Sequence, residues 1–378
     1  MTPKPARPVV VFASMYFDGH QLYDQRLARA LATSNPILYV EPPTPLLRRP
    51  GKDKRTFGFG STNADGVTTF TPATLPLGSR RLLYPLSGLL IALQIWIGIF
   101  ARLRTVRFQS VFIAVNPVTK RLFPARRSVS LIKDDYAAAS NLIGIPKEVV
   151  QSRFRSTIRR AHNVVVVSPV LRSILLRRGV RSRIIPAGCH IPEQQWDEPA
   201  ELSDVAHPRA VFVGMVSDRI DLNLMQAVVE SGVSVVGVGQ VQPTFSKQVQ
   251  FEQLRAHANF HWLPPRSGPD LEAVIQHCAV GLIPYELSEF NRSSFPLKAF
   301  EYLACGKVVV STALPSMTWL ESENVRTATG AVEFASEVHD ALAQASDSGV
   351  IAACTSYAEN NTWAMRADEF RALLGNNQ

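Results

Sequence analysis

The stretch from residue 280 to residue 312 constrains the fold of this chain more than any other. It begins with an apolar strand, Val280 to Pro284, passes through a polar loop, Glu286 to Arg292, and continues into a helix. Gly306 suits the position after a helix end, where the backbone needs positive φ. The β-branched run Val308 to Thr312 predicts a second buried strand. Strands and helices that alternate in this way are typical of α/β proteins.

The start of the predicted helix has the pattern of an anion site. Ser294 is placed to cap the helix, and Lys298 falls in the first turn, where the helix dipole disfavours a cation. A bound phosphate or diphosphate would account for this lysine, because its ammonium and the backbone N–H groups of Leu297 and Lys298 would all bind it. Glu301 is then placed to accept hydrogen bonds from ribose hydroxyls. The alternative is that Lys298 and Glu301 form an i, i+3 ion pair on a solvated face.

The sequences IPY at 283–285 and SSFPLKAFEYLACGKVVVST at 293–312 resemble the nucleotide-sugar site of GT-B glycosyltransferases. In that family a P-x-K-x-x-E-Y-L-A-x-G-x-x-V-V pattern holds the donor nucleotide. The sequence is most similar to bacterial polysaccharide enzymes, namely the teichuronic acid glycosyltransferases and, more distantly, the xanthan glucuronosyltransferase. The resemblance implies that Tyr285 lines the donor cleft, with core packing as the alternative. Many retaining relatives have a second Glu where this chain has Ser293, so inversion is preferred here.

Charge is divided unevenly along the chain. Residues 1–195 contain 29 Lys and Arg against 9 Asp and Glu, a net charge of +20, whereas the remainder contains 11 against 22, a net charge of −11. A basic half suits nucleic acid, an anionic membrane surface or an anionic substrate. The sequence has no C2H2 finger and no aromatic RNA-binding motif, so we expect no nucleic acid and favour a membrane surface.

Length, cysteine use and the N-terminal sequence bound the class of protein. A chain of 378 residues that is 46% hydrophobic and 19% charged suits two globular domains. The four cysteines are scattered without C-x-x-C pairs, so we expect reduced thiols rather than a zinc site or disulfides. The N-terminus enters a strand without the apolar region and cleavage site of a signal peptide. We therefore expect the protein to stay in the cytoplasm.

The most apolar segment runs from Leu82 to Ala101 and is flanked by arginines. Its length approaches that of a transmembrane helix. However, it contains Pro85, Gly88 and Gln94, and the alternation of strands and helices resumes after it. We therefore expect a helix that docks on the sheet or lies in the bilayer interface, with the arginines on anionic headgroups. A transmembrane helix is the alternative.

The first strand, residues 8–14, leads into a loop and then an amphipathic helix that ends near Ala32. Gly19 and His20 lie in this loop at the carboxyl end of the strand, where open parallel sheets bind ligands, so both are candidates for the acceptor side. A surface histidine without a role is the alternative for His20, because the loop has no G-x-G-x-x-G spacing.

Two adjacent carboxylates, Asp134 and Asp135, end the predicted strand Val129 to Lys133. A neighbouring carboxylate raises the pKa of a carboxyl group, which suits a general base that takes a proton from a hydroxyl. The xanthan glucuronosyltransferase is similar at this point, and the resemblance implies that Asp135 is the base, with Asp134 as the second choice. The alternative is that both carboxylates cap the following helix.

The alternation also predicts the domain boundaries. We expect an N-terminal acceptor domain over residues 1–190 and a linker rich in Glu and Pro over 191–208. A nucleotide-sugar domain follows over 209–358. The resemblance implies that a C-terminal helix, 359–378, crosses back onto the first domain.

Two residues near the start of the second domain are candidates for donor binding. Gly214 ends a strand and lets the donor approach the backbone closely. Arg219 is placed to reach a diphosphate, or instead forms a surface pair with Asp218 or Asp221.

These features predict an α/β protein of the GT-B fold, with two Rossmann-like domains that face each other across a cleft. The resemblance implies a glycosyltransferase of the hexosyltransferase type. It would move a sugar from a nucleotide-sugar donor, expected to be UDP-linked, to a saccharide or lipid-linked acceptor in cell-envelope or exopolysaccharide synthesis. We expect no metal or other cofactor, because Lys298 and the helix dipole would stabilise the leaving diphosphate. We also expect peripheral association with the inner face of the plasma membrane. The alternatives are a sugar-nucleotide 2-epimerase of the same fold and a non-catalytic scaffold protein.

Overall fold

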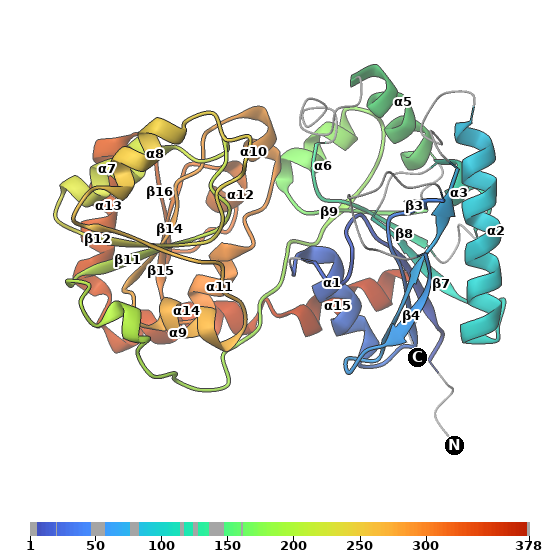
Figure 1. Ribbon diagram of the computed structural model, residues 1–378, viewed down its shortest axis with the longest axis horizontal. Coiled ribbons are helices and arrows are strands. Elements are labelled where there is room, and N and C mark those ends of the chain that lie inside the picture. The colour runs from blue at the N-terminus through green and yellow to red at the C-terminus, as the bar shows by residue number, and fades with distance from the viewer. Residues whose placement is uncertain are drawn as a thin grey trace. The chain divides into compact units, whose positions relative to one another are not determined.

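A computed structural model describes residues 6–19, 21–46, 57–75, 83–113, 117–123, 128–135, 147–159 and 162–375. The chain forms two compact units (Figure 1). The first consists of Met1–Val167, Leu171–Pro186 and Trp363–Gln378, and the second of Ser168–Val170 and Ala187–Thr362. The predicted linker, 191–208, lies within the second unit, where it includes a short 3-10 helix, Ala200–Leu202.

The second unit is built on a parallel sheet of six strands in the order β13-β12-β11-β14-β15-β16. Relative to the first strand of the unit this order is 3-2-1-4-5-6, the arrangement of a Rossmann sheet. The four inner strands are fully buried and contain several valines, as expected for a sheet with helices on both faces, whereas each edge strand, β13 and β16, has two half-buried residues. They are β11 (Arg209–Val213), β12 (Ser234–Val238), β13 (Phe260–Leu263), β14 (Val280–Ile283), β15 (Val308–Thr312) and β16 (Val325–Ala328).

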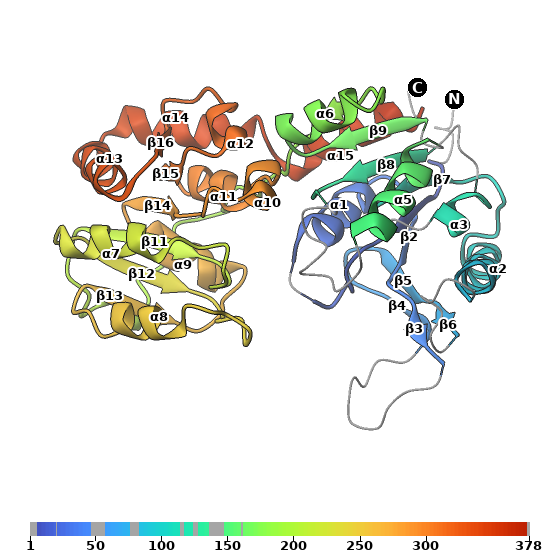
Figure 2. The ribbon, with the colours of Figure 1, turned by 90° about the horizontal axis from the view of Figure 1, so that it is seen from above.

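The helices of this unit alternate with its strands (Figure 2). Gly306, with φ of +72°, follows the end of α11 as predicted. The helices are α7 (Leu222–Glu230), α8 (Gln248–Arg255), α9 (Pro269–Gln276), α10 (Glu289–Ser293), α11 (Lys298–Ala304), α12 (Pro315–Thr318), α13 (Ala331–Gln344) and α14 (Ser348–Glu359).

The first unit contains a sheet of eight strands in the order β10-β9-β8-β7-β1-β2-β5-β4. Strands β5, β2, β1, β7, β8 and β9 repeat the 3-2-1-4-5-6 order. Strand β4 runs antiparallel to β5, and the other pairs of this sheet are parallel. The strands are β1 (Val9–Phe12), β2 (Ile37–Val40), β4 (Gly58–Thr62), β5 (Val67–Thr71), β7 (Gln109–Phe112), β8 (Ser128–Ile132), β9 (Asn163–Val166) and β10 (Arg183–Ile184).

A separate two-stranded ladder joins β3 (Thr44–Pro45) to β6 (Ala73–Thr74). The region from residue 42 to residue 65 is rich in Pro and Gly, which is typical of a loop, but it contains β3 and β4. Its Gly and Pro content hid these strands, but Phe59 of β4 packs on Phe70 of β5 with ring centroids 4.7 Å apart. Cross-strand pairing of this kind depends on a partner that local sequence does not reveal.

Helices of the first unit are α1 (Tyr23–Ala32), α2 (Tyr84–Leu103), α3 (Pro117–Lys120), α5 (Lys147–Ile158), α6 (Pro169–Leu176, from Leu171 onward) and α15 (Trp363–Leu373). The last helix packs on α1. Trp363 is buried edge-on against Tyr23, with ring centroids 5.0 Å apart, and Arg371 donates hydrogen bonds to the Ala30 carbonyl and the Asn35 amide oxygen.

The apolar segment is helix α2, which docks on the sheet. By length and composition it is long and apolar enough to cross a membrane. In the structure, 39% of its most apolar window is buried. Ile95 and Ile99 pack in a cluster with Phe12 of β1 and Phe112 of β7. Its amide residue, Gln94, pairs through both side-chain polar atoms with the backbone of Ala73.

Candidate functional site

The order of the six strands of the second unit places a topological switch point between β11 and β14. The chain leaves β11 toward β12 and leaves β14 toward β15, on opposite sides. Open α/β sheets bind ligands at the carboxyl ends of such a strand pair. The predicted donor residues Gly214, Arg219 and Tyr285 all lie in the loops at these two strand ends.

Tyr302, on α11, ties the two strands together at this point. Its hydroxyl accepts a hydrogen bond from the backbone N–H of Val213 at 2.9 Å and lies 3.4 Å from the carbonyl of Leu282. Burial raises the pKa of this phenol well above its usual value, so it stays protonated. Gly281 makes room for the ring, because a Cβ there would lie 2.2 Å from Tyr302 Cδ2. Sequence analysis assigned no role to this tyrosine.

Gly214 begins the loop after β11, where the backbone of a neighbouring loop passes very close. A Cβ on Gly239 would lie 1.9 Å from the Gly214 carbonyl oxygen, so Gly239 must be glycine. The requirement for glycine therefore lies at Gly239. A Cβ on Gly214 would meet only the ring of Phe212, at 3.5 Å.

Arg219 lies over two aromatic rings. Its guanidinium carbon is 5.2 Å from the ring centroid of Tyr285 and 4.8 Å from that of Phe290. Its Nε donates to the Asn291 Oδ1 at 2.7 Å. Asp218 instead accepts hydrogen bonds from Ser246, which lower the pKa of its carboxyl, and Asp221 caps α7. Among the described contacts, neither proposed surface pair is formed.

Asn291 is the residue that joins the two loops, and sequence analysis missed it. It is fully buried and uses its whole side chain: Oδ1 accepts from Arg219, and Nδ2 donates to the carbonyls of Arg219 and Glu286 at 3.0 and 2.8 Å. The Glu286 N–H completes the link by donating to the Arg219 carbonyl at 2.8 Å. An asparagine in a polar run carries no signal of such a role, because its partner lies 72 positions earlier.

The predicted cap at Ser294 is wrong. Residues 289–293 form a short helix, α10, and Ser294 closes its end: both the N–H and the hydroxyl of Ser294 donate to the Asn291 carbonyl. Helix α11 begins only at Lys298, with Leu297 at the capping position and no side-chain cap. The reason is that the hydroxyl finds an acceptor three residues back, as serines often do at turns.

Lys298 and Glu301 form an ion pair, with the ammonium 2.5 Å from the carboxylate Oε2. Both side chains are mostly buried rather than on a solvated face, with 23% and 12% exposed. Lys298 therefore lies in the first turn of α11, as predicted, and contacts Glu301 at the i, i+3 spacing of the alternative interpretation.

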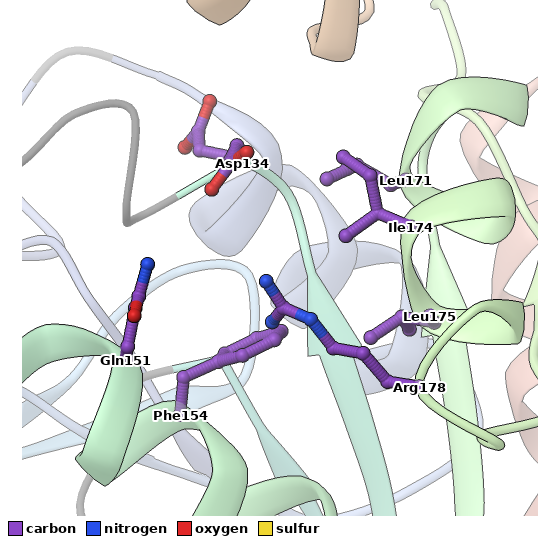
Figure 3. Close-up of a pocket in the computed structure, with 8 residues that line it drawn as sticks. Asp134, Gln151, Phe154, Leu171, Ile174, Leu175 and Arg178 are labelled. Atoms are coloured by element: carbon purple, nitrogen blue, oxygen red, sulfur yellow. The ribbon is translucent and has the colours of Figure 1, made fainter. Parts of the chain in front are cut away.

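Asp134 and Asp135 lie at the carboxyl end of β8 in the first unit and line a pocket (Figure 3). The side of α6 forms an apolar wall, and Gln151 and Phe154 of α5 form another part of the lining. The Arg178 guanidinium lies 5.5 Å from the centroid of the Phe154 ring. The lining residues from α6 and the turn after it are Leu171, Ile174, Leu175 and Arg178.

A buried ion pair fixes the strand that carries these carboxylates. Asp24 of α1 is fully buried and accepts the Lys133 ammonium, the residue directly before Asp134. Its other oxygen accepts from the N–H and hydroxyl of Ser14, at 2.7 and 2.8 Å. Sequence analysis missed this group, since the pair is 109 residues apart. Gly19 lies in the same loop after β1, where its N–H donates to the Tyr16 carbonyl, and His20 lies outside the described residues.

The described residues provide neither a cluster of metal ligands nor a disulfide near the candidate site. Within the described ranges, no group of three or more His, Cys, Asp and Glu is placed to hold a metal ion. The four cysteines, all in the second unit, are free thiols.

Comparisons with known proteins give the fold and the class of the second unit. Residues 207–348 match the family described as glycosyl transferases group 1. A segment of 116 residues is 29% identical to a teichuronic acid biosynthesis glycosyltransferase, TuaH, of Bacillus subtilis. That match covers 30% of this chain and 29% of TuaH, so the chain matches less than a third of the relative's length.

Solved structures match nearly the whole chain at low identity. Sucrose-phosphate synthase of Thermosynechococcus elongatus has a TM-score of 0.73 at 14% identity, over 98% of this chain and 99% of that one. HepE of Anabaena, solved with UDP, has a TM-score of 0.69 at 13% identity, over 98% and 100%. HepE has also been solved with UDP-glucose. The chain therefore has the GT-B fold, and its residues 207–348 match the glycosyl transferases group 1 family.

Proposed function

We propose that this protein transfers a sugar from a nucleotide-sugar donor, UDP-linked, to a saccharide or lipid-linked acceptor in the synthesis of cell-envelope or extracellular polysaccharide. The group 1 domain, the likeness to TuaH and the UDP complexes of HepE support a donor of this class. The observation that carries the proposal is the arrangement at the switch point of the second unit.

There the Arg219 guanidinium is held by Asn291 and by two aromatic rings. A guanidinium has several donors in a fixed plane, and Nε alone is used by Asn291, so the remaining N–H groups can bind diphosphate oxygens. The Tyr285 ring then lies beside the bound nucleotide. Lys298 adds a second cation, which exchanges its ion pair with Glu301 for the diphosphate and frees Glu301 for the ribose hydroxyls.

The acceptor is bound by the first unit in this proposal. The carboxylate of Asp135 takes the proton of the acceptor hydroxyl as its oxygen bonds to the anomeric carbon. The bond from that carbon to the diphosphate breaks, and the nucleoside diphosphate leaves with the electron pair. Arg219 and Lys298 stabilise the charge on the leaving group without a metal ion. The preferred outcome is inversion at the anomeric carbon.

The experiment that tests the donor site is a thermal-shift and calorimetric screen of the purified protein against UDP, GDP, ADP and TDP, each with and without Mg²⁺. We expect UDP to stabilise the protein equally in both conditions. Stabilisation only with Mg²⁺ would disprove metal independence, and the absence of stabilisation by any nucleotide would favour a non-catalytic scaffold.

Product analysis separates transfer from epimerisation. A transferase releases UDP only when acceptor is present, whereas a 2-epimerase converts or hydrolyses the donor alone. We also propose that the protein is cytoplasmic and works at the inner face of the plasma membrane. Fractionation of cells that express the tagged chain tests this location.

A further inference from the structure

We propose that one face of α2 binds the surface of an anionic lipid bilayer, with the helix lying in the plane of the membrane. This inference concerns where the enzyme binds rather than what it transfers, and it does not depend on the donor site. It rests on an exposed apolar stripe and on the charges at one end of it.

Helix α2 has two apolar faces. Its inner face, with Ile95 and Ile99, is buried in the core on β1, β2 and β7. Its outer face carries five large side chains that are each 51% to 68% exposed. These side chains are Leu86, Leu89, Leu93, Ile97 and Phe100.

The outer side chains follow one another at intervals of three or four residues, which places them in one stripe along the helix. Phe59 of β4, itself 38% exposed, packs beside α2 at Gly98. Two strongly exposed apolar residues of the second unit, Val249 and Val332, lie on separate helices, α8 and α13. Isolated exposed residues are normal on soluble proteins, whereas a contiguous stripe marks an interaction site.

The charges around α2 select the partner. The helix has no acidic residue, and Arg102, Arg104 and Arg107 are all exposed at its carboxyl end. The Arg102 guanidinium lies 4.9 Å from the centroid of the Phe59 ring, so cation and apolar surface adjoin. Anionic headgroups above acyl chains offer the complement to this pattern. A second copy of α2 would bring only further arginines and apolar side chains, without an acidic partner.

The buried inner face also fixes the orientation. A spanning helix would expose Ile95 and Ile99 to lipid and remove them from the core of the first unit. An interfacial helix keeps that face on the protein and inserts the other below the headgroups, where the flanking arginines reach lipid phosphates. Peripheral rather than integral binding follows.

Flotation with lipid vesicles tests the proposal. The wild-type chain should float with vesicles of phosphatidylcholine and phosphatidylglycerol and bind pure phosphatidylcholine more weakly. The double variant Leu93→Gln/Ile97→Gln should lower the partition coefficient about a hundredfold on the mixed vesicles. The matched control Val249→Gln/Val332→Gln, which changes exposed apolar residues of the second unit, should bind as wild type does.

A second pair of substitutions isolates the charges. Arg102→Gln/Arg107→Gln should weaken binding to the anionic vesicles about thirtyfold and leave binding to neutral vesicles unchanged. Because all six substituted sites are exposed, far-UV circular dichroism and UDP binding should match those of the wild type in every variant. A loss of UDP binding would concern the proposed function, whereas these vesicle results concern α2 alone.

Three results would overturn the inference. Unchanged flotation of Leu93→Gln/Ile97→Gln would show that the stripe does not meet lipid. Retention in membranes after alkaline carbonate extraction would show a spanning helix. A dimer in light scattering that Leu93→Gln/Ile97→Gln dissociates, without vesicle binding by the wild type, would assign the stripe to a second copy.

Discussion

The two units share a strand order but hold the ends of their central strands by different chemistry. In the first unit a fully buried carboxylate, Asp24, pairs with Lys133 and so ties α1 and β1 to the end of β8. In the second, the neutral amide of Asn291 joins the loops after β11 and β14 and orients Arg219. The buried ion pair neutralises the Lys133 ammonium within the first unit. The neutral Asn291 amide leaves the positive charge of the Arg219 guanidinium available to an anion.

The outer surfaces of the two units also differ. The first unit exposes an apolar stripe with arginines at its end, whereas the exposed valines Val249 and Val332 of the second unit lie on separate helices. In the function proposed above, the same Rossmann-like frame is used for two kinds of partner, an acceptor at the lipid surface and a polar nucleotide. The variants below separate these roles, because each changes one unit.

The largest expected effect is that of Asp135→Asn in the first unit. Removal of a general base should lower the transfer rate about 10²- to 10⁴-fold and leave the affinity for UDP unchanged, because the donor residues belong to the second unit. The rate of UDP release from the donor with acceptor present measures the first quantity, and calorimetry the second. If Asp134→Asn has the greater effect, the base is Asp134; if neither reduces the rate, the pocket is not catalytic.

The next largest effect is expected for Asp24→Asn, which should destabilise the folded protein. Without the carboxylate, the Lys133 ammonium stays largely buried without its anion, which costs about 3 to 5 kcal/mol in the free energy of unfolding. Urea denaturation measures this cost. The control Asp65→Asn breaks the partly exposed pair with Arg29 and should cost less than about 1 kcal/mol. Equal costs for the two variants would contradict the structural role given to Asp24.

The sequence predicted the buried strands of the second unit closely. The run from Val308 to Thr312 was expected and found without a change in its bounds, because a β-branched run between a glycine stop and a polar turn has few other conformations. The approximate course of α2 and the glycine after α11 were also predictable from local rules.

The contacts that build the candidate site could not be predicted in the same way. Asn291, Tyr302 and Asp24 act through partners 72, 89 and 109 residues away, so nothing in their own neighbourhood marks them. Ser294 was misassigned for a related reason: serine caps the start of a helix and closes the end of another by equally local bonds. The sequence pattern therefore predicts where the strands end, whereas the side chains that hold those strand ends and loops together are identified only by their tertiary contacts.

Asn291→Leu should loosen the donor loops of the second unit. The Glu286 carbonyl would lose its buried donor, while the Arg219 carbonyl would keep the Glu286 N–H, so the change costs about 1 to 3 kcal/mol. The guanidinium would also lose its hydrogen bond to the Asn291 amide oxygen. We therefore expect about a tenfold weaker affinity for UDP together with a lower urea midpoint. Asn360→Leu, at an exposed amide directly after the last residue of α14, should change neither quantity. If the Asn291→Leu protein is destabilised but binds UDP with normal affinity, the orientation of Arg219 by Asn291 does not contribute to donor binding.

Lys298→Ala should weaken UDP binding about tenfold, because a charge-assisted hydrogen bond to phosphate is lost. The free energy of unfolding should fall by about 1.5 to 3 kcal/mol, because the Glu301 carboxylate, only 12% exposed, loses its hydrogen bond from a charged donor. Glu301→Gln removes the same ion pair but keeps the ammonium, so it provides the matched comparison in calorimetry. Equal UDP affinity in Lys298→Ala and the wild type would reduce the pair to a structural contact and disprove the anion site.

The smallest effect concerns the thiols, which report on the second unit alone. Burial raises the pKa of Cys278 and Cys305 to about 12 and that of Cys354 to about 11. The folded state therefore favours the neutral thiols, and this part of the stability is complete below the ordinary thiol pKa of 9.0 and lost as pH rises from there toward 12. At pH 8 iodoacetamide should label the folded chain slowly and the unfolded chain fast.

This labelling decides whether the two units unfold independently. In Asp24→Asn at intermediate urea, the lesion lies in the first unit and the thiols lie in the second. If the units are independent, the circular dichroism signal should fall in part before labelling begins. Simultaneous loss of signal and gain of label would mean that the packing of α15 on α1 couples the units, because α15 follows the second unit directly in the chain and belongs to the first. The two units would then differ in the groups that hold their strand ends, Asp24 with Lys133 in one and Asn291 in the other, but would unfold as one cooperative unit.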